Sequence, residues 1–422
     1  MSVGSFISRK LSLRQGANGN RLAPSIIVAI GGIALSFFVM MVSIAVVTGF
    51  KNEIARKIMG FDAQVTMTPL GVYYGEPDAK ATLSDEVSQI VSEALDKAGV
   101  ADSVELYSTF SQTGLLKTDD DFMGVAFQCF DDGYKWEFEK GNLREGILPT
   151  IENPRGITIS EEMSRKLHLS VGDRVNAYFF TGAHVRPRKF EVIGIYCSDF
   201  GDYDNLVAYA PREALAGMAG YKSADEGVAI KIRGLRDAKK IENVAQQLQG
   251  EFNRAFAMKE LEHNYVVSTV YTTGAMYFNW LAMLDTNIVV ILVLMGCVSG
   301  FMLIACVLIL ILERVRMVGM LKAIGATNGL IKGVFIRLGV RVVGVGLLIG
   351  NCVGWLFVLV QGVWHLLPLD PESYYLSYVP VEMPLTYWLI LNVGVGVLSL
   401  ALMLVPTSVI SRLSIVKVLR FE

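Results

Sequence analysis

Four long apolar stretches divide this chain of 422 residues, at 25–48, 288–312, 342–367 and 385–410, and none of them contains Lys, Arg, Asp or Glu. About 20 apolar residues, rising ~1.5 Å each in a helix, cross a hydrocarbon core roughly 30 Å thick. The pattern therefore predicts four transmembrane helices. The predicted bounds of these helices are 25–48, 284–312, 331–367 and 386–410.

The long segment between the first two spans has a different pattern. After the first span, KNEIARKIMG (51–60) keeps a helical period, so that helix is expected to continue outward as a stalk. Ala63, Val65 and Met67 then alternate with polar residues, as in a half-buried strand. Further runs predict an α+β domain over residues 49–283, with helices at 83–98, 160–168 and 237–250 and strands at 103–117, 122–130, 173–181, 188–197, 205–210 and 227–233. Residues 160–182 are typical of a helix leading into a small-barrel hairpin.

Charge orients the chain in a membrane. Residues 1–24 and the 313–341 loop are basic, as is the tail, whereas the 368–385 loop has only acidic charge. The positive-inside rule places both termini and the 313–341 loop in the cytoplasm, and the acidic 49–283 domain on the other side. The predicted order is a basic segment 1–24, span 25–48, extracytoplasmic domain 49–283, span 284–312, cytoplasmic helix 313–330, span 331–367, extracytoplasmic loop 368–385, span 386–410 and cytoplasmic tail 411–422.

A search for chemistry in the sequence is mostly negative. The four histidines are scattered without a metal-binding spacing, and Asp119–Asp121 fits a solvated turn better than a calcium loop. There is no nucleophile-elbow motif and no phosphate-binding GxxxxGK[ST] loop. We therefore predict no catalytic residue, no cofactor and no metal site. Whether Cys129 and Cys197 pair is left open.

Small residues recur at four-residue spacing within the spans, which lets helices approach closely and predicts helix–helix contacts. The residues are Gly32, Ser36, Gly296, Gly300, Gly346, Gly350 and Gly354. Because the four apolar stretches carry no charge, they offer no proton relay or ion path. The spans are expected to handle an apolar substrate or to transmit force. Four helices are few to enclose a route, so a second copy or a related subunit is expected.

The sequence TGAHVRPRKF (181–190) is expected to be a loop between two strands. Its basic residues stand out in an acidic domain. It is either a polar hairpin tip or a site for a soluble partner, which basic residues would steer. The candidate residues are Gly182, Val185, Arg186, Pro187, Arg188 and Lys189.

The cytoplasmic stretch ERVRMVGMLKAIGATNGLIK (313–332) predicts an amphipathic helix ended by Gly325. Met317, Val318, Met320, Leu321 and Ile324 should lie on one side, against the membrane interface or other helices. Arg316, Gly319, Lys322 and Ala323 should form the opposite side, open to another protein. The alternative is a basic helix that only anchors to anionic lipid.

The same stretch resembles the E-R-x-x-E-[IV]-G-x-[LM]-[KR]-A-[IL]-G-[AS] signature of the FtsX/MacB-like ABC-transporter permeases. It departs from that signature at Met317, where an acid is common. Within that family, VVTGFKNEI (46–54) and YCSDFGDYDNLVAY (196–209) resemble the lipoprotein-releasing permeases of the LolC/LolE type. The resemblance implies an ATPase-docking coupling helix made of Glu313, Arg314, Arg316, Val318, Gly319, Leu321, Lys322, Ala323, Gly325 and Ala326. It also implies Porter-like and Sabre-like lobes in the outer domain, and a hook for a periplasmic carrier, placed here at 182–189.

What the resemblance implies is the membrane subunit of a mechanotransmission-type ABC transporter in a bacterial inner membrane. Its expected partners are a cytoplasmic ABC ATPase dimer, a second permease subunit, lipoprotein cargo, a periplasmic carrier and membrane lipid, with no nucleic acid. The alternatives are a MacB-like efflux permease and an FtsX-like regulator of a cell-wall hydrolase. The sequence leaves open the cargo, the choice between homodimer and heterodimer, and the true position of the hook.

Overall fold

The computed structural model describes residues 24–74, 83–100, 104–131, 134–181, 184–215, 229–235, 237–313 and 315–409. The chain forms two compact units. The helical unit contains Met1–Asn52, Trp280–Pro368 and Tyr378–Glu422, and the outer unit contains Glu53–Asn279 and Leu369–Ser377. Each unit is described by itself.

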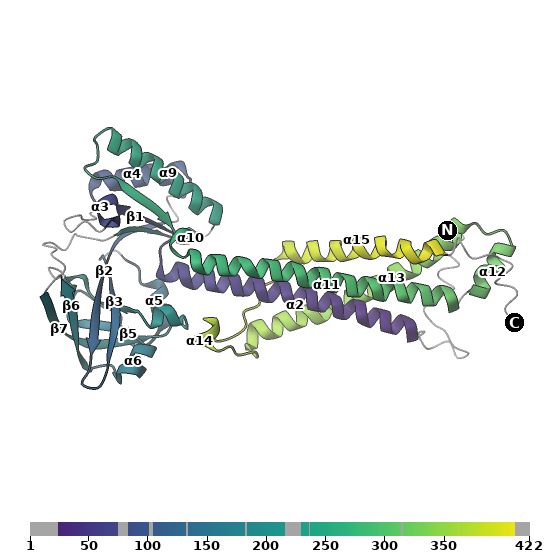
Figure 1. The fold of residues 1–422 in the computed structure, drawn as a ribbon, viewed down its shortest axis with the longest axis horizontal. Coiled ribbons are helices and arrows are strands. Elements are labelled where there is room, and N and C mark those ends of the chain that lie inside the picture. Colours follow the sequence, from purple (N-terminus) through teal and green to yellow (C-terminus); the bar gives the residue numbers. More distant parts are fainter. Residues whose placement is uncertain are drawn as a thin grey trace. The chain divides into compact units, whose positions relative to one another are not determined.

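The helical unit is built on four helices long and apolar enough to cross a membrane (Figure 1). They are α2 (Pro24–Phe61), α11 (Ala275–Glu313), α13 (Asn328–Trp364) and α15 (Leu385–Val409). Each overlaps a predicted span. Helices α2 and α11 extend beyond their spans, whereas α13 and α15 are shifted by three residues and one residue toward the N-terminus. In particular, α2 continues without a break to Phe61, as expected for the stalk. The short helix α12 (Val315–Ala323) lies between α11 and α13 in the chain.

Two hydrophobic clusters hold these helices together. One joins α2, α11, α12, α13 and α15 around Ile33, Leu303 and Phe335. The other joins α2, α13 and α15 around Phe37, Met41 and Val358. Each buries apolar side chains from helices far apart in the sequence, so the bundle is held by tertiary packing.

The outer unit contains a ten-stranded sheet with the order β10-β1-β9-β2-β3-β8-β5-β7-β4, and β6 pairs with both β2 and β7. Its strands are β1 (Val65–Pro69), β2 (Glu105–Lys117), β3 (Phe122–Phe130), β4 (Leu143–Gly146), β5 (Gly156–Ser160), β6 (Arg174–Thr181), β7 (His184–Tyr196), β8 (Val207–Tyr209), β9 (Ala229–Arg233) and β10 (Tyr265–Thr269). Its helices are α3 (Leu70–Tyr73), α4 (Asp85–Lys97), α5 (Glu137–Asn142), α6 (Glu161–Leu167), α7 (Gly201–Asp204), α8 (Arg212–Leu215), α9 (Ala238–Ala257), α10 (Val270–Thr273) and α14 (Pro371–Tyr374).

One part of this sheet closes on itself. Pairing runs from β2 to β3, β8, β5, β7 and β6, and returns to β2. The enclosed core contains Phe127, Phe179 and Ile159 and is covered by α6. Closure removes sheet edges, which would otherwise be open to pairing with other chains. The small barrel expected from residues 160–182 is present.

The other part is an open sheet of β10, β1 and β9, with the start of β2, covered by α4 and α9 (Figure 1). Ser84 and Asp237 cap these two helices through their side chains. Gln249 of α9 bonds the carbonyl of Tyr265 and the N–H of Val267, which satisfies backbone groups on the edge strand β10. Each lobe of the outer unit thus has a hydrophobic core of its own. The equivalence of the two lobes to Porter-like and Sabre-like lobes stays a prediction.

The expected strands and helices of this unit are present, with shifts of one to several residues at their ends. The pattern did not predict β4, β5 or β10. All five residues of β5 are buried, so it has no alternation to detect. The prediction of a loop at 181–190 was wrong, because β7 begins at His184 and Val185–Lys189 pair with β6. Pro187 fits there because this end of β7 lies at a sheet edge.

Candidate functional site

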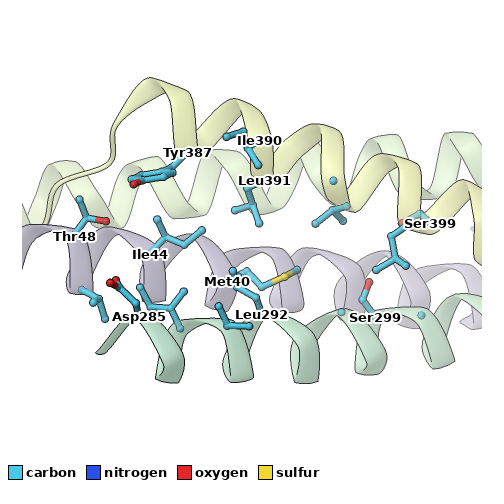
Figure 2. Close-up of a pocket in the computed structure, with 18 of the residues that line it drawn as sticks. Met40, Ile44, Thr48, Asp285, Leu292, Ser299, Tyr387, Ile390, Leu391 and Ser399 are labelled. Carbon is cyan, nitrogen blue, oxygen red and sulfur yellow. The ribbon is translucent and has the colours of Figure 1, made fainter. Parts of the chain in front are cut away.

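A cavity of about 540 Å³ lies between α2, α11 and α15 in the helical unit (Figure 2). Its wall is apolar along most of its length. The apolar side chains come from all three helices and include Met40, Ile44, Leu292, Ile390, Leu391 and Leu398. A pocket of this size and lining suits an apolar or amphipathic ligand.

Polar side chains gather at one end of this cavity. Thr48 and Asp285 lie there in Figure 2, and Lys51 and Asn52 complete that end. The Lys51 ammonium contacts both carboxylate oxygens of Asp285 at 2.7 Å, which joins α2 to α11. In the predicted topology, this is the extracytoplasmic end.

The short helix α12 is anchored to the bundle through one face. Val318 is buried in the helix cluster, Gly319 is also buried, and Leu321 and Ala326 pack against the same cluster. Met320 and Ile324 are 57% and 85% exposed, and Ala323 is exposed beside them. The prediction that Gly319 lies on the open side was wrong, because Gly319 is buried next to Val318 on the face that packs against the bundle. The open face is formed by Met320, Ala323 and Ile324.

The remaining predicted coupling-helix residues have varied positions. Glu313 and Gly325 are exposed, and Lys322 is half-buried. Gly325 has φ +95°, a left-handed backbone that favours glycine and ends the helix as expected. Arg314 lies outside the described residues, and the structure does not describe the side chain of Arg316. Docking of an ATPase here stays a prediction.

The small residues of the spans lie at helix contacts. A side chain on Gly32 would collide with Met302 of α11, and one on Gly300 with Leu402 of α15. A Cβ on Gly296 would lie 3.4 Å from Leu398. On α13, Cβ atoms at Gly346, Gly350 and Gly354 would collide with Ile33, Phe37 and Met41 of α2. Ser36 is buried.

A polar contact that sequence reasoning missed connects α13 and α15. The indole N–H of Trp388 donates to Asn351 Oδ1 at 2.6 Å, and the Asn351 amide donates to Asn392 Oδ1 at 2.8 Å. Both asparagines also donate to backbone carbonyls of their own helices. Asparagines within an apolar span are the sequence signal that could have pointed to such an interhelical bond.

The end of the stalk is embedded in the outer unit at what we call the stalk joint, made of Gly60, Phe61, Asp62, Phe138, Phe200, Tyr203 and Arg233. Phe61 stacks on Tyr203, with ring centroids 4.4 Å apart, and meets Phe138 edge to face at 5.0 Å. The Tyr203 hydroxyl donates to Asp62, and Arg233 of β9 donates to the carbonyl of Gly60. The stalk end therefore contacts both lobes.

A second layer braces this joint. Arg233 lies 4.9 Å from the ring centroid of Tyr134 and 3.9 Å from the buried Glu139, which accepts a bond from the Tyr134 hydroxyl. On the other side, Phe200 stacks on Tyr375, whose carbonyl accepts from Lys57 of the stalk at 3.0 Å. Aromatic packing and charge-assisted hydrogen bonds both favour one fixed geometry.

Burial alters the titration of several groups near the stalk joint. It lowers the pKa of the Lys57 ammonium, although Asp199 opposes this. It raises the pKa of Asp204 to about 6, against hydrogen bonds from Ser198, and the pKa of the Cys197 thiol to about 11. Burial and the Asp62 carboxylate raise the pKa of Tyr203, so its hydroxyl stays protonated and donates.

The candidate carrier hook lies on the β6–β7 hairpin. Val185, Arg186, Pro187, Arg188 and Lys189 are all exposed, and Phe180 beside them on β6 is 59% exposed. Gly182 lies outside the described residues. The hairpin thus presents basic and apolar side chains together, and its role as a hook stays a prediction.

Other candidate sites have structural roles. Cys129 and Cys197 are both free thiols. Asp119–Asp121 form the turn between β2 and β3, where Thr118 bonds Asp121. His168 and His365 end helices in a left-handed conformation. Within the part of the chain that the structure describes, no cluster of His, Cys, Asp or Glu is suited to a metal ion.

Comparisons with known proteins place these features in context. The model of a MacB-like periplasmic core domain matches residues 26–251, and that of an FtsX-like permease C-terminal region matches residues 288–415. The lipoprotein-releasing system transmembrane protein LolC of Xylella fastidiosa strain 9a5c is 21% identical over 93% of this chain and 92% of its own. The LolC protein of strain Temecula1 is 20% identical over the same shares.

Among solved structures, the extracellular domain of the noncanonical ABC-type transporter YknZ from Gram-positive bacteria aligns over 49% of this chain and 99% of its own. The identity is 16% and the TM-score 0.32. A score this low does not establish a shared fold.

Proposed function

Because the chain belongs to the FtsX/MacB-like permease family of ABC transporters, we propose that it is the permease subunit of a lipoprotein-extracting transporter. In this proposal it takes lipoproteins from the outer leaflet of the inner membrane and passes them to a periplasmic carrier. A separate cytoplasmic ATPase supplies the energy. The two LolC relatives, matched over nearly the whole chain, support this cargo class.

The cavity between α2, α11 and α15 is the observation that carries the proposal. Its apolar walls suit acyl chains, and its polar end suits the head of a lipid anchor. Moving an acyl chain out of a bilayer costs roughly 0.8 kcal/mol per CH₂, so several chains cost tens of kcal/mol. A cavity that rebinds the chains offsets part of this cost, and in this proposal ATP hydrolysis supplies the remaining free energy of extraction.

Helix α12 is proposed to dock on the ATPase and to be displaced by its conformational change. Met320 and Ala323 of this helix and Ile324 directly after it are exposed, and they form an apolar knob that suits a groove on another protein. Its opposite face is packed into the cluster shared with α2, α11, α13 and α15. A displacement of α12 would therefore move the bundle, because packed helices shift as rigid bodies.

The same displacement is proposed to reach the outer unit along α2. That helix is continuous from Pro24 to Phe61, and its end is held by the stalk joint. Two such subunits, identical or related, would bring their outer domains together and empty the cavities. The β6–β7 hairpin is the proposed landing site for the carrier.

A MacB-like efflux permease is the second candidate, favoured by the match of residues 26–251 to a MacB-like periplasmic core domain. It would use the same coupling but take substrates from the periplasm. An efflux permease has no use for a cavity that holds a lipid anchor, so cavity occupancy separates the two functions.

Gentle solubilisation and mass spectrometry of the complete complex test the proposal. We expect an ATPase, and lipoprotein that crosslinks to a photoreactive group placed at Leu391 inside the cavity. A group at the exposed Leu389 of the same helix serves as the matched control. Crosslinks to phospholipid alone at both positions would contradict lipoprotein extraction, and an absent ATPase would contradict the transporter itself.

A further inference from the structure

We infer that the edge of strand β10 is a pairing surface that fits the same strand of a second copy of this chain, and that the carboxamide of Gln249 keeps this surface closed. The inference concerns the outer unit alone and does not depend on the proposed function. It identifies the surface through which two outer units would join and the residue that prevents this.

Strand β10 lies at one end of the outer sheet. Within the described residues, it pairs with β1 on one side and with no strand on the other. Tyr265 lies opposite Pro69, which lacks an N–H, as expected for a pair whose backbone groups point away from each other. Alternate residues of a strand share one orientation, so Tyr265, Val267 and Thr269 direct their N–H and C=O groups away from β1.

Side chains bond to these outward-facing groups. At the start of the edge, the Tyr265 N–H donates to Asn264 Oδ1 at 2.8 Å. At its end, the Thr269 N–H donates to Thr272 Oγ1 at 2.8 Å, and the Thr269 carbonyl accepts from the Thr272 hydroxyl at 2.8 Å. The middle of the edge is covered by a residue from another element, Gln249 of α9.

The carboxamide of Gln249 bonds to the edge as one residue of a parallel strand would. Its nitrogen donates to the Tyr265 carbonyl and its oxygen accepts from the Val267 N–H, both at 2.9 Å. In a parallel ladder, a residue likewise donates to one carbonyl and accepts from the N–H two positions further along the neighbouring strand. The same nitrogen donates to Asn253 Oδ1 at 3.2 Å, which fixes the orientation of the carboxamide. A side chain therefore occupies the place of a strand.

The sequence of β10 favours pairing with another copy once the edge is open. The run 265–270 is rich in β-branched residues, and uncharged runs of this kind pair readily as strands. No Asp, Glu, Lys or Arg occurs from 264 to 284, so charge does not oppose the approach of a second β10. The strand also lacks the proline or charged residue that commonly protects an edge. Two copies can pair antiparallel about a two-fold axis, which closes the assembly at two chains.

Removing the carboxamide from the full chain tests this surface. Gln249→Met keeps a side chain of similar size without hydrogen-bonding groups, so the middle of the edge becomes open. We expect the fraction of nanodiscs that pair with one another at micromolar concentration to rise about tenfold or more, because two backbone groups lose their partners and regain them in the pair. Sedimentation velocity measures the pairing. Gln246→Met, which changes an exposed glutamine of the same helix, is the matched control.

Hydrogen exchange resolved by residue gives an independent readout. In dilute Gln249→Met discs, the Val267 amide should exchange about tenfold faster than in the unmodified chain, and it should regain protection as concentrated discs pair. Ser268→Lys added to Gln249→Met should abolish the pairing, because like charges on two facing edges repel, while the fast exchange remains.

Three results would overturn the inference. They are a folded Gln249→Met chain whose discs never pair, pairing that persists after Ser268→Lys is added, and exchange of the Val267 amide that is unchanged by the loss of Gln249. If Gln249→Met does not fold, Gln249→Asn replaces it with the same expectations, because the shorter side chain cannot reach both backbone groups.

Discussion

Asp204 shows how one buried residue makes the outer unit sensitive to pH. Its carboxylate accepts from the hydroxyl of Ser198 at 2.6 Å and from the same residue's N–H. Burial nevertheless raises its pKa to about 6 from the ordinary 3.8. Between these values the folded chain binds more protons than the unfolded chain. The contribution of Asp204 to stability is therefore greatest below about pH 4 and falls as pH rises through 6.

Replacing Asp204 by Asn should remove this dependence while keeping a hydrogen-bond acceptor. The shift corresponds to at most about 3 kcal/mol, so Asp204→Asn should melt several degrees higher than the parent near pH 7.5, and the advantage should vanish near pH 4. Thermal unfolding of the purified full chain across that range is the measurement. Asp119→Asn, on an exposed turn, controls for loss of one charge. An advantage that is independent of pH would contradict the assignment.

At the scale of elements, α12 has two faces with different roles. Val318 and Gly319 are buried against the bundle, while Ile324 in the knob is 85% exposed. Substitutions on the exposed face should therefore affect association with the ATPase, and substitutions on the buried face should affect folding.

Ile324→Asp should weaken association with the ATPase about tenfold or more, as expected for an apolar contact residue at an interface, and leave expression unchanged. Gly319→Leu should instead lower the yield of folded protein, because a buried glycine has no room for a side chain. Copurification of the ATPase and size-exclusion profiles measure the two effects. Normal ATPase binding by Ile324→Asp would exclude the knob as the docking surface.

The β6–β7 hairpin is the second element with a separable role. Arg186→Glu, Arg188→Glu and Lys189→Glu together should slow association of the periplasmic carrier about tenfold at low salt, because steering charges act on the encounter rate. The matched control changes Arg144 and Arg155, exposed on the same lobe, to Glu. Binding kinetics of the immobilised full chain would show the difference. Equal slowing by both sets would indicate a general charge effect.

For the whole molecule, the stalk joint is the expected weak point of force transmission. It holds the end of α2 against both lobes through Phe61, Tyr203 and Arg233. If movement of the bundle reaches the outer unit through this joint, a loosened joint should uncouple ATP hydrolysis from movement of the outer unit. Hydrolysis itself should continue.

Tyr203→Phe removes the bond to Asp62 and keeps the ring stack. Because the lost bond contributes about 1–3 kcal/mol, we expect the amount of lipoprotein released per ATP hydrolysed to fall several-fold. The hydrolysis rate of the complete complex should stay within about twofold of the parent. Tyr178→Phe, on the barrel, is the control. A fall in hydrolysis that matches the fall in release would mean that the joint is not the transmission point.

The sequence by itself determined the four spans, the stalk, α12 and most strands, because each is specified by a local pattern. An apolar run such as 25–48 is recognised as a span from its length alone. The strand at Ala63, Val65 and Met67 is recognised from its alternation of apolar and polar residues alone. The resemblance carried by 313–326 further pointed to the family.

Only the tertiary structure decided which of these elements meet. The buried face of α12, the closed barrel with the patternless β5, and the stalk joint all depend on contacts between residues far apart in the chain. The cavity and its Lys51–Asp285 pair bring together helices separated by more than two hundred residues. Local pattern cannot specify such contacts, because they are selected by packing of the whole fold.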